Sequence, residues 1–424
     1  MIKMIVNNKK LLIILSIAAV IIGIVLRFYI YNKTIIGKPP RLDEQYQFYQ
    51  TEKHIKEKRF PVSGVFLNTP ETYDNEENAR VPGGYFYLVY IVKYLIGGQT
   101  YEGARLVNLI TSILVSIIFF VWIYKRFSLT TFSIMLILMS VNVYFINAGN
   151  NIYNPHNPLI LSFIFLPVLY EYLYNDKKFI YAVLLFPILA LSAQCHFSNF
   201  FSIIPSLIVF LIIRWKKDTR KNIIPLAIGV FISFLTYLPY LIYQFQNHFE
   251  SLSKILGRKS ELSSHYVIQP PQIYSILLFT TNEGGSKYVN GLKDIINSYF
   301  GKNPLYTFTF IFYVLSFIFA LIALIYAYKH FFTKKMLTDN DRKTNSLKEL
   351  LFFYMVYIIS TIAFYMICGI AGGGRPHYFY SSFTLGFVPI IYFIENIRYT
   401  KPKYINYICI YALLNMIAII IYRI

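Results

Sequence analysis

The chain has 424 residues, 56% of them hydrophobic, and its mean hydropathy is +0.50. A soluble domain needs a polar surface that this composition does not supply, so the chain is predicted to be an integral membrane protein. The formal net charge of +20 does not by itself indicate a nucleic-acid partner, because Lys and Arg accumulate in the cytoplasmic connections of membrane proteins. The three cysteines, Cys195, Cys368 and Cys409, have neither disulfide-framework nor metal-ligand spacing.

Apolar runs that are long enough to cross a bilayer recur along the whole chain. A helix needs about 20 mostly apolar residues to cross the hydrocarbon core, so the sequence predicts an all-α polytopic protein with about eleven transmembrane helices. These helices fall near residues 11–31, 106–124, 129–146, 158–174, 179–193, 197–213, 223–243, 306–328, 350–367, 381–393 and 404–422. The fifth, sixth and tenth are short for a full crossing.

The first apolar run follows Lys9 and Lys10. It is too long and too uniformly apolar for the core of a signal peptide, and no small-residue cleavage site follows it. We therefore expect it to remain as the first span, with the N-terminus in the cytoplasm.

Basic residues mark alternate connections between the predicted spans. The clusters are Lys9 and Lys10, Lys125 and Arg126, Lys177 and Lys178, residues 214–221, residues 334–343, and residues 398–403. By the positive-inside rule these connections, including the loop 329–349, are cytoplasmic. The connections on the opposite, outer face are residues 32–105, 147–157, 194–196, 244–305 and 368–380. In the first outer connection, residues 32–105, nine Asp and Glu nearly balance ten Lys and Arg. Most of the net positive charge therefore belongs to the cytoplasmic side, and no nucleic-acid partner is expected.

The first outer connection, residues 32–105, contains an adjacent pair of carboxylates, Asp43 and Glu44. These acids also suit the first turn of a helix that lies along the membrane interface, where the helix dipole favours negative charge. Residues 85–96 are apolar but too short to span, so we expect a re-entrant or surface-lying helix there. Such a helix would return the loop to the membrane face beside Asp43.

Polar side chains gather on the predicted outer face. They are Asp43, Glu44, Arg80, Glu102, Arg105, Asn147, Asn150, Asn151, Asn154, His156, Gln194, His196, His248, His265, Arg375 and His377. Each of these residues also has an ordinary structural interpretation. Asn-Pro pairs commonly begin turns and helices, and charged residues at the ends of spans commonly face lipid headgroups. Their convergence on one side predicts a polar pocket at the outer leaflet. We assign Asn154, His156, His196 and His377 to this pocket.

A pocket of this kind suits the transfer of a sugar from a lipid phosphate. The phosphate is already a good leaving group, so its departure needs charge stabilisation by Arg, Lys or a divalent metal ion and no general acid. The attacking hydroxyl needs one carboxylate as its base. Asp43 and its neighbour Glu44 are the candidate catalytic residues. Arg80, Arg105 and Arg375 are the candidates for binding the donor phosphate, and the requirement for a divalent metal ion is left open.

The order of several short motifs resembles one family of membrane enzymes. Over about its first 250 residues the chain resembles the GT-C glycosyltransferases of the dolichyl-phosphate-mannose protein mannosyltransferase and aminoarabinose transferase type. The motifs are the Asp-Glu pair at 43–44, PGGYFYL at 82–88, GARLVN at 103–108, YNPHNP at 153–158, QCHFS at 194–198 and LPYLIYQFQN at 238–247. Farther along, only RPHYF at 375–379 adds to the resemblance.

The resemblance implies that residues 1–424 form one transmembrane domain with a catalytic site on its extracytoplasmic face, in a bacterial inner membrane. It implies an inverting, single-displacement transfer from a polyprenyl-phosphate sugar to an acceptor hydroxyl, with Asp43 as the base. The connection between the third and fourth spans offers Asn and His where those families have another acid, so no metal site is carried over. Residues 244–305 are the candidate loop for the acceptor, which is a lipid, a glycan or a protein.

Two other functions fit parts of the pattern. An outer-leaflet polysaccharide polymerase or ligase would also place Arg and His outside, although mainly in late loops. A lipid-sugar transporter or flippase usually carries ionisable or helix-breaking positions near the middle of the membrane. Because most charges here lie at span ends and the acidic pair comes early, the sequence favours the transferase.

Overall fold

The computed structural model describes residues 9–40, 42–67, 80–175, 178–250, 253, 275–280, 304–332, 342–368 and 376–423. Most of the predicted acceptor-facing loop, residues 244–305, lies outside these ranges, as does Arg375. The described part is almost entirely helical and includes one antiparallel pair of short strands, β1 (Ser63–Phe66) and β2 (Arg80–Pro82).

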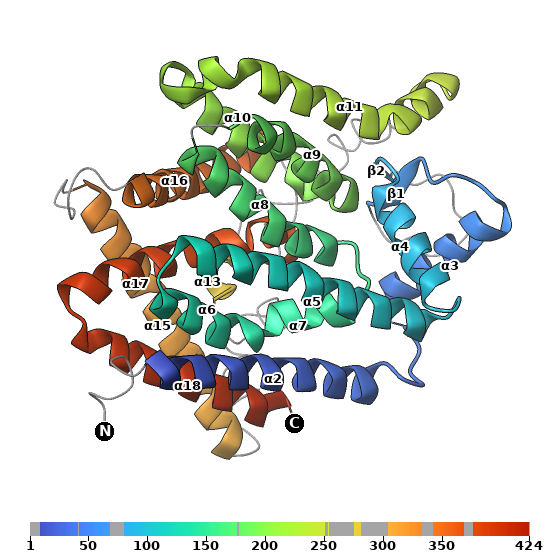
Figure 1. The fold of residues 1–424 in the computed structure, drawn as a ribbon. Helices are drawn as coiled ribbons and strands as arrows, with labels where there is room; N and C mark the ends of the chain where they lie inside the picture. Colours follow the sequence, from blue (N-terminus) through green and yellow to red (C-terminus); the bar gives the residue numbers. More distant parts are fainter. Residues whose placement is uncertain are drawn as a thin grey trace.

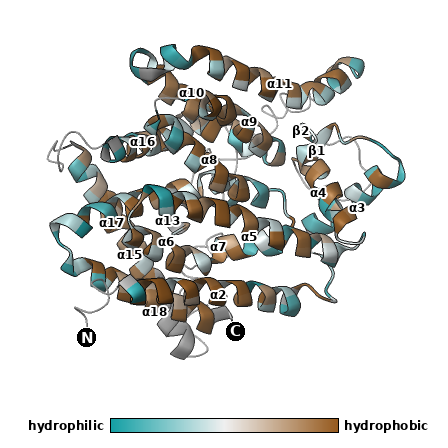
Figure 2. Cartoon of the chain, in the orientation of Figure 1, coloured by the Kyte–Doolittle hydropathy of each residue, from teal (hydrophilic) through white to brown (hydrophobic). Residues whose placement is uncertain are grey.

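Seven of the described helices are long and apolar enough to cross a membrane. They are α2 (Lys9–Thr34), α5 (Tyr101–Arg126), α8 (His156–Tyr174), α11 (Ile223–Gln246), α15 (Pro304–Phe332), α16 (Arg342–Cys368) and α18 (Lys403–Arg423). Figure 2 shows hydrophobic residues along most of the length of these helices. The predicted all-α polytopic class is confirmed.

Several shorter elements complete the membrane-embedded part. They are α6 (Leu129–Ser140), α7 (Val143–Asn150), α9 (Phe179–Cys195), η1 (Phe197–Phe200), α10 (Ile203–Ile213), η2 (Trp215–Thr219), η3 (Arg220–Asn222) and α13 (Ser275–Leu278). Helices α6 and α7 are long and apolar enough to cross a membrane only when they are taken together, as one helix bent by 57°. At the bend Asn142 caps α7, because its side-chain oxygen accepts from the Phe145 N–H. Eleven full crossings therefore stay a prediction.

The tenth predicted span, residues 381–393, is not one continuous α-helix. The chain there makes two 3-10 segments, η5 (Pro376–Ser382) and η6 (Thr384–Phe387), before the α-helix α17 (Val388–Thr400). Every residue from 379 to 397 is buried. The Thr384 hydroxyl donates to the Ser162 carbonyl of α8 over 2.8 Å. The burial of this segment thus reflects a place inside the bundle.

Ion pairs tie neighbouring helices together at one end of the bundle. They are Arg126–Glu171 between α5 and α8, Arg214–Glu349 between the end of α10 and α16, and Lys343–Glu395 between α16 and α17. Each basic partner comes from a connection predicted to be cytoplasmic, so the predicted inner connections do gather at one end. The three acids lie within the basic face and offset part of its charge.

The described elements of the first predicted outer connection form a cap at the opposite end of the bundle (Figure 1). We call α3 (Leu42–Lys56), β1, β2 and α4 (Tyr85–Ile96) the cap. Helix α4 confirms the short helix predicted over residues 85–96. It packs against α3, α5 and α9, and its Phe86, Tyr87 and Tyr90 side chains are completely buried.

Close backbone approaches explain the glycines that bracket α4. A Cβ atom on Gly84 would lie 1.8 Å from the Pro61 carbonyl oxygen, and one on Gly103 would lie 1.8 Å from the Gly97 carbonyl oxygen. No side chain fits at such distances. The start of α4 therefore lies against the chain that follows α3, and its end lies against the start of α5, which fixes the cap on the bundle.

Candidate active site

The two adjacent acids of α3 lie in different surroundings. Asp43 is half-buried, and the Tyr153 hydroxyl lies 3.5 Å from its Oδ2 atom. Glu44 is only 4% exposed, and its Oε2 atom accepts hydrogen bonds from Arg105 and from the Tyr101 hydroxyl, both over 2.9 Å. Consecutive helical residues point about 100° apart, so one helix directs the two carboxylates to different partners.

Arg105, near the start of α5, is buried together with Glu44. Its Nη2 atom donates to Glu44 and to the Asn151 side chain, and its guanidinium lies over the Tyr101 ring, 4.5 Å from the centroid. The ion pair joins α3 to α5, while Asn151 adds the connection between α7 and α8. The sequence predicted that Arg105 binds the donor phosphate, and the structure places its charge against a carboxylate.

The C-terminal end of α7 is held by a buried Asn–Lys pair that sequence analysis missed. The Asn108 amide nitrogen donates to the carbonyls of Ala148 (3.0 Å) and Gly149 (2.7 Å). Its amide oxygen accepts from Lys93 Nζ over 2.7 Å. Burial lowers the pKa of the Lys93 ammonium to about 8. The available signal was a lysine inside the apolar run 85–96, because such a residue needs an internal partner when it is buried.

Three histidines from three different connections form a row of neighbouring rings with Tyr153. The Tyr153 ring lies 5.4 Å from the His156 ring and 6.4 Å from the His377 ring, between centroids. The His377 ring lies 5.8 Å from that of His196. Since the Tyr153 hydroxyl also lies 3.5 Å from Asp43 Oδ2, Tyr153 stands between the predicted base and this group of histidines. We call Asp43, Tyr153, His156, His196 and His377 the ring cluster.

Asn154, the fourth predicted pocket residue, holds two segments together. Its side-chain oxygen accepts from Gln47 Nε2 over 3.0 Å, and its side-chain nitrogen donates to the Cys195 carbonyl over 3.1 Å. It is 8% exposed. Asn154 therefore positions α3 against the end of α9, next to the ring cluster.

The hydrogen bonds around His196 determine its tautomer. The Ser198 hydroxyl donates to the Tyr378 carbonyl over 2.8 Å, so its oxygen accepts from Nδ1–H of His196, 2.6 Å away. The packing around the ring lowers the pKa of His196 far below its ordinary value through burial. The imidazole is therefore neutral, and Nε2 is the acceptor that it offers to a ligand.

Arg80 lies on the strand side of the cap. Its guanidinium lies 4.0 Å from the centroid of the Phe66 ring, which in turn lies 5.1 Å from that of Tyr46. Tyr46 is one turn of α3 beyond Asp43. Arg375 directly precedes Pro376 in the sequence and lies outside the described residues.

Comparisons with known proteins find a similarity of fold and no similarity of sequence family. No family model matches the sequence, and no curated protein matches it. Among solved structures the chain is similar to the archaeal oligosaccharyltransferase AglB of Archaeoglobus fulgidus, in complex with an inhibitory peptide and a dolichol-phosphate. The TM-score is 0.55 at 12% identity, over 96% of this chain and 55% of that one. The chain shares the fold of the matched part of this oligosaccharyltransferase.

Two more structures of the oligosaccharyltransferase from this organism have the same fold as this chain. One, tethered to an acceptor peptide containing the NVT sequon, has a TM-score of 0.55 at 12% identity, over 97% of this chain and 55% of that one. Another, complexed with Zn and sulfate, has a TM-score of 0.54 at 13% identity, over 96% of this chain and 52% of that one. The chain thus spans about half the length of these proteins. The likeness of fold extends beyond the first 250 residues, where the motif resemblance was concentrated.

The described residues of this chain do not fit a metal site. No three His, Cys, Asp or Glu side chains among them form a group that could hold an ion. Asp43 and Glu44 face different partners, and both amide atoms of Asn154 are bonded within the protein. The divalent metal ion therefore stays a prediction from the sequence.

We expect acid to destabilise the protein partly through His196. Its pKa in the folded state lies below the unfolded value of about 6.5, so the unfolded chain binds a proton first as the pH falls. The contribution of neutral His196 to the free energy of unfolding is complete above about pH 6.5. Below that pH it is lost at up to about 1.4 kcal/mol per pH unit. Thermal unfolding at pH 7.5 and pH 5 should show a smaller loss for His196→Gln than for the wild type. His248→Gln, at an exposed position, should behave as the wild type; an undiminished loss in His196→Gln would contradict the assignment.

Proposed function

We propose that the chain is a membrane glycosyltransferase that moves a sugar from a polyprenyl-phosphate donor to an acceptor hydroxyl. The observation that carries this proposal is the position of Asp43. On a GT-C fold, the cap sets this half-buried carboxylate beside Tyr153, whose ring lies near the His156 and His377 rings, and His377 in turn adjoins His196. The dolichol-phosphate and the acceptor peptide bound by the similar structures support a lipid-phosphate donor and an acceptor that enters separately.

In the proposed reaction Asp43 is the general base. The acceptor oxygen attacks the anomeric carbon as its proton passes to the Asp43 carboxylate, and the bond from that carbon to the phosphate oxygen breaks. Polyprenyl phosphate leaves with the bonding electrons. One displacement inverts the anomeric configuration, and a single carboxylate suffices because the leaving group needs no proton.

Glu44 and Arg105 act in this proposal as positioning residues. Each neutralises the other's charge in a buried pair, so α3 is held in the rotation that turns Asp43 toward Tyr153. The donor phosphate is then assigned to Arg80 and Arg375. His196, with Nε2 as an acceptor, is suited to bind a hydroxyl of the donor sugar.

The proposed location follows from the charge distribution. The basic connections and their ion pairs occupy the end opposite the cap, so the positive-inside rule puts the cap outside. We therefore place the site on the extracytoplasmic face of a bacterial inner membrane, where polyprenyl-phosphate sugars can enter from the bilayer.

The test uses the full chain in lipid nanodiscs. The protein is incubated with short-chain polyprenyl-phosphate sugars and with lipid, glycan and peptide hydroxyl acceptors, and released polyprenyl phosphate is measured by mass spectrometry. We expect release that depends on the acceptor, and a product of inverted anomeric configuration by NMR. Movement of the intact lipid-linked sugar across vesicle membranes, without release of phosphate from any donor, would instead identify a transporter.

A further inference from the structure

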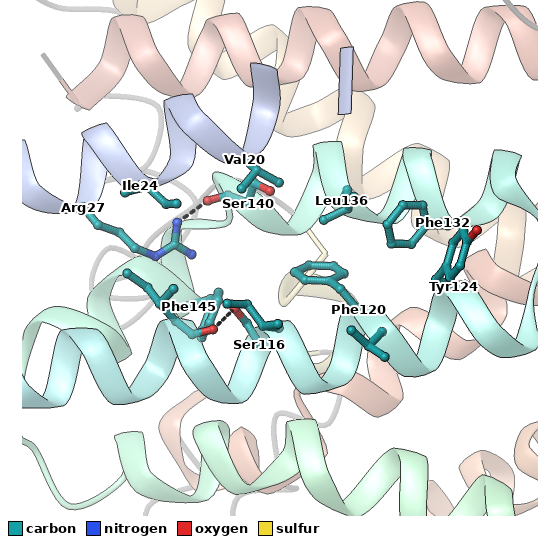
Figure 3. A pocket seen from close by; sticks show the side chains of 13 residues that line it. Val20, Ile24, Arg27, Ser116, Phe120, Tyr124, Phe132, Leu136, Ser140 and Phe145 are labelled. Carbon is teal, nitrogen blue, oxygen red and sulfur yellow. Dashed lines mark hydrogen bonds between the residues drawn. The ribbon is translucent and has the colours of Figure 1, made fainter. Parts of the chain in front are cut away.

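An apolar groove lies in the half of the bundle that includes its basic end, away from the cap and the ring cluster (Figure 3). Helices α2, α5 and α6 supply most of its lining, and Phe145 of α7 adds to it. Its volume is about 480 Å³. Ile117 and Val121 on its α5 side are 51% and 46% exposed, so the groove is open to the surrounding lipid.

The two ends of the groove lie at different depths in the membrane. Figure 3 shows Tyr124 at one end and Arg27 at the other. Tyr124 directly precedes the basic residues that end α5, whereas Ile113, the first lining residue of α5, lies near the middle of that helix. Between Ile113 and Tyr124 the helix rises about 17 Å, compared with about 15 Å for half of the hydrocarbon core. The groove therefore extends from the membrane surface at the basic end to the middle of the bilayer, which is the depth of one leaflet.

Arg27 closes the groove at its inner end. The side chain is 3% exposed, and its Nη1 atom donates to the Gly23 carbonyl over 2.9 Å and to the Ser140 carbonyl. The guanidinium also lies over the Phe145 ring, 4.7 Å from the centroid. Because the protein itself covers this cation, it offers no anion site, and the groove ends here without entering the cap-side half of the membrane.

The outer end of the groove carries free cations. Lys10 at the start of α2 and Lys125 at the end of α5 are exposed, and neither makes an ion pair within the described ranges. Arg126, the next residue, is neutralised by Glu171 of α8. The Tyr124 side chain is 59% exposed at the same end. Lysine and tyrosine side chains at a membrane surface are suited to a lipid phosphate, so the two helices that wall the groove supply countercharge for an anionic headgroup.

We propose that the groove binds one anionic phospholipid of the leaflet on the basic side. The phosphate lies at the outer end, where Lys10 and Lys125 supply the countercharge, and one acyl chain lies along the groove with its methyl end toward Arg27. A phospholipid of the opposite leaflet does not fit, because its headgroup lies on the cap side, beyond the closed end. The site and the ring cluster lie in opposite halves of the membrane, so the proposal does not depend on sugar transfer.

The first experiment measures which lipid the purified full-length protein retains. The protein is reconstituted in vesicles of equal parts phosphatidylglycerol and phosphatidylcholine with identical chains, extracted, and analysed by native mass spectrometry. We expect the wild type to retain one phosphatidylglycerol preferentially, and Lys10→Gln and Lys125→Gln each to lower that preference about fivefold. Lys216→Gln is the matched control, because it removes an exposed cation of η2 outside the groove, and it should keep the preference. An unchanged preference when both Lys10 and Lys125 are replaced would overturn the proposal.

A second pair of variants tests the groove independently of the charge. Val121→Trp fills the groove at an exposed position, so the fold should tolerate it, and retained lipid should fall roughly fivefold because the acyl chain loses apolar contacts. Val230→Trp makes the same change on the lipid-facing side of α11, at 49% exposure, and should leave retention unchanged. Equal retention by these two variants would contradict the proposal. So would displacement of phosphatidylglycerol from the wild type by inorganic phosphate, which would indicate a free-anion site, or by equimolar polyprenyl phosphate, which would assign the groove to the donor.

Photolabelling tests the orientation of the chain in the groove. Phosphatidylglycerol with a diazirine at the carboxyl end of one acyl chain should label α5 near Tyr124. The same lipid with the diazirine at the methyl end should label α5 near Ile113, and mass spectrometry of the peptides locates both labels. The reverse order would place the headgroup on the cap side, and an absence of label between these two residues would leave the groove empty; either result would refute the assignment.

Discussion

Replacing Asp43 by Asn is expected to lower sugar transfer by about 10²- to 10⁴-fold while donor binding is largely retained. Asn keeps the size and hydrogen-bonding capacity of the side chain but cannot accept the acceptor's proton. Because Asp43 is half-buried and α3 is held by its neighbour Glu44, the fold should be unaffected. The measurement is turnover and donor affinity in nanodiscs. Glu52→Gln, which changes an acid at the far end of the same helix, should retain wild-type turnover.

The same variant separates the competing functions. A transporter would be little affected by Asp43→Asn, and a polymerase or ligase would depend instead on Arg375 or His377. Turnover of Asp43→Asn within threefold of the wild type, together with inactivity of His377→Gln, would refute Asp43 as the base. Loss of both turnover and donor binding in Asp43→Asn would indicate that the substitution disrupts the folded structure of the site.

Replacing Glu44 by Gln is expected to lower the free energy of unfolding by about 3–5 kcal/mol. The substitution leaves the Arg105 guanidinium buried without its countercharge, at 4% exposure. Thermal unfolding in detergent measures the loss. The matched control is Glu57→Gln, which breaks the Arg59–Glu57 pair of the same cap; both of its side chains are exposed, so the change should stay below about 1 kcal/mol.

The double variant Glu44→Gln with Arg105→Met should recover part of that stability, because no unpaired charge then remains buried. If Arg105 served the donor phosphate instead, Arg105→Met alone would leave the unfolding temperature unchanged and weaken donor binding. An unchanged unfolding temperature in Glu44→Gln would contradict the positioning role that we assign to the pair.

Hydropathy and length were sufficient to predict the helical class and the short helix at residues 85–96, but not the strand pair that completes the cap. These features follow from how many consecutive residues are apolar, which is local information. The convergence of outer connections followed from the positions of basic residues along the chain. The contacts of Asp43 and Glu44 could not be predicted in this way, since they depend on partners such as Arg105 and Tyr153 that lie far along the chain.

Single charges inside apolar runs were the main omission. Arg27 sits in a run that otherwise reads as an ordinary first span, and Lys93 lies in the apolar helix of the cap. Both are buried, with partners that come from other helices: Ser140 for Arg27 and Asn108 for Lys93. An ionisable residue within such a run is itself a signal of a binding or positioning role.

The ion pairs at the two ends of the bundle differ in their access to dissolved ions. Arg105 and Glu44 have side chains only 5% and 6% exposed, whereas Lys217, at the far end, is 64% exposed where it contacts Glu349. Electrolyte screens contacts in water and hardly reaches those inside the protein. Rising ionic strength should therefore weaken the Lys217–Glu349 contact first. The orientation of the Asp43 carboxylate, which depends on the buried Arg105–Glu44 pair, should stay the same in dilute and concentrated salt.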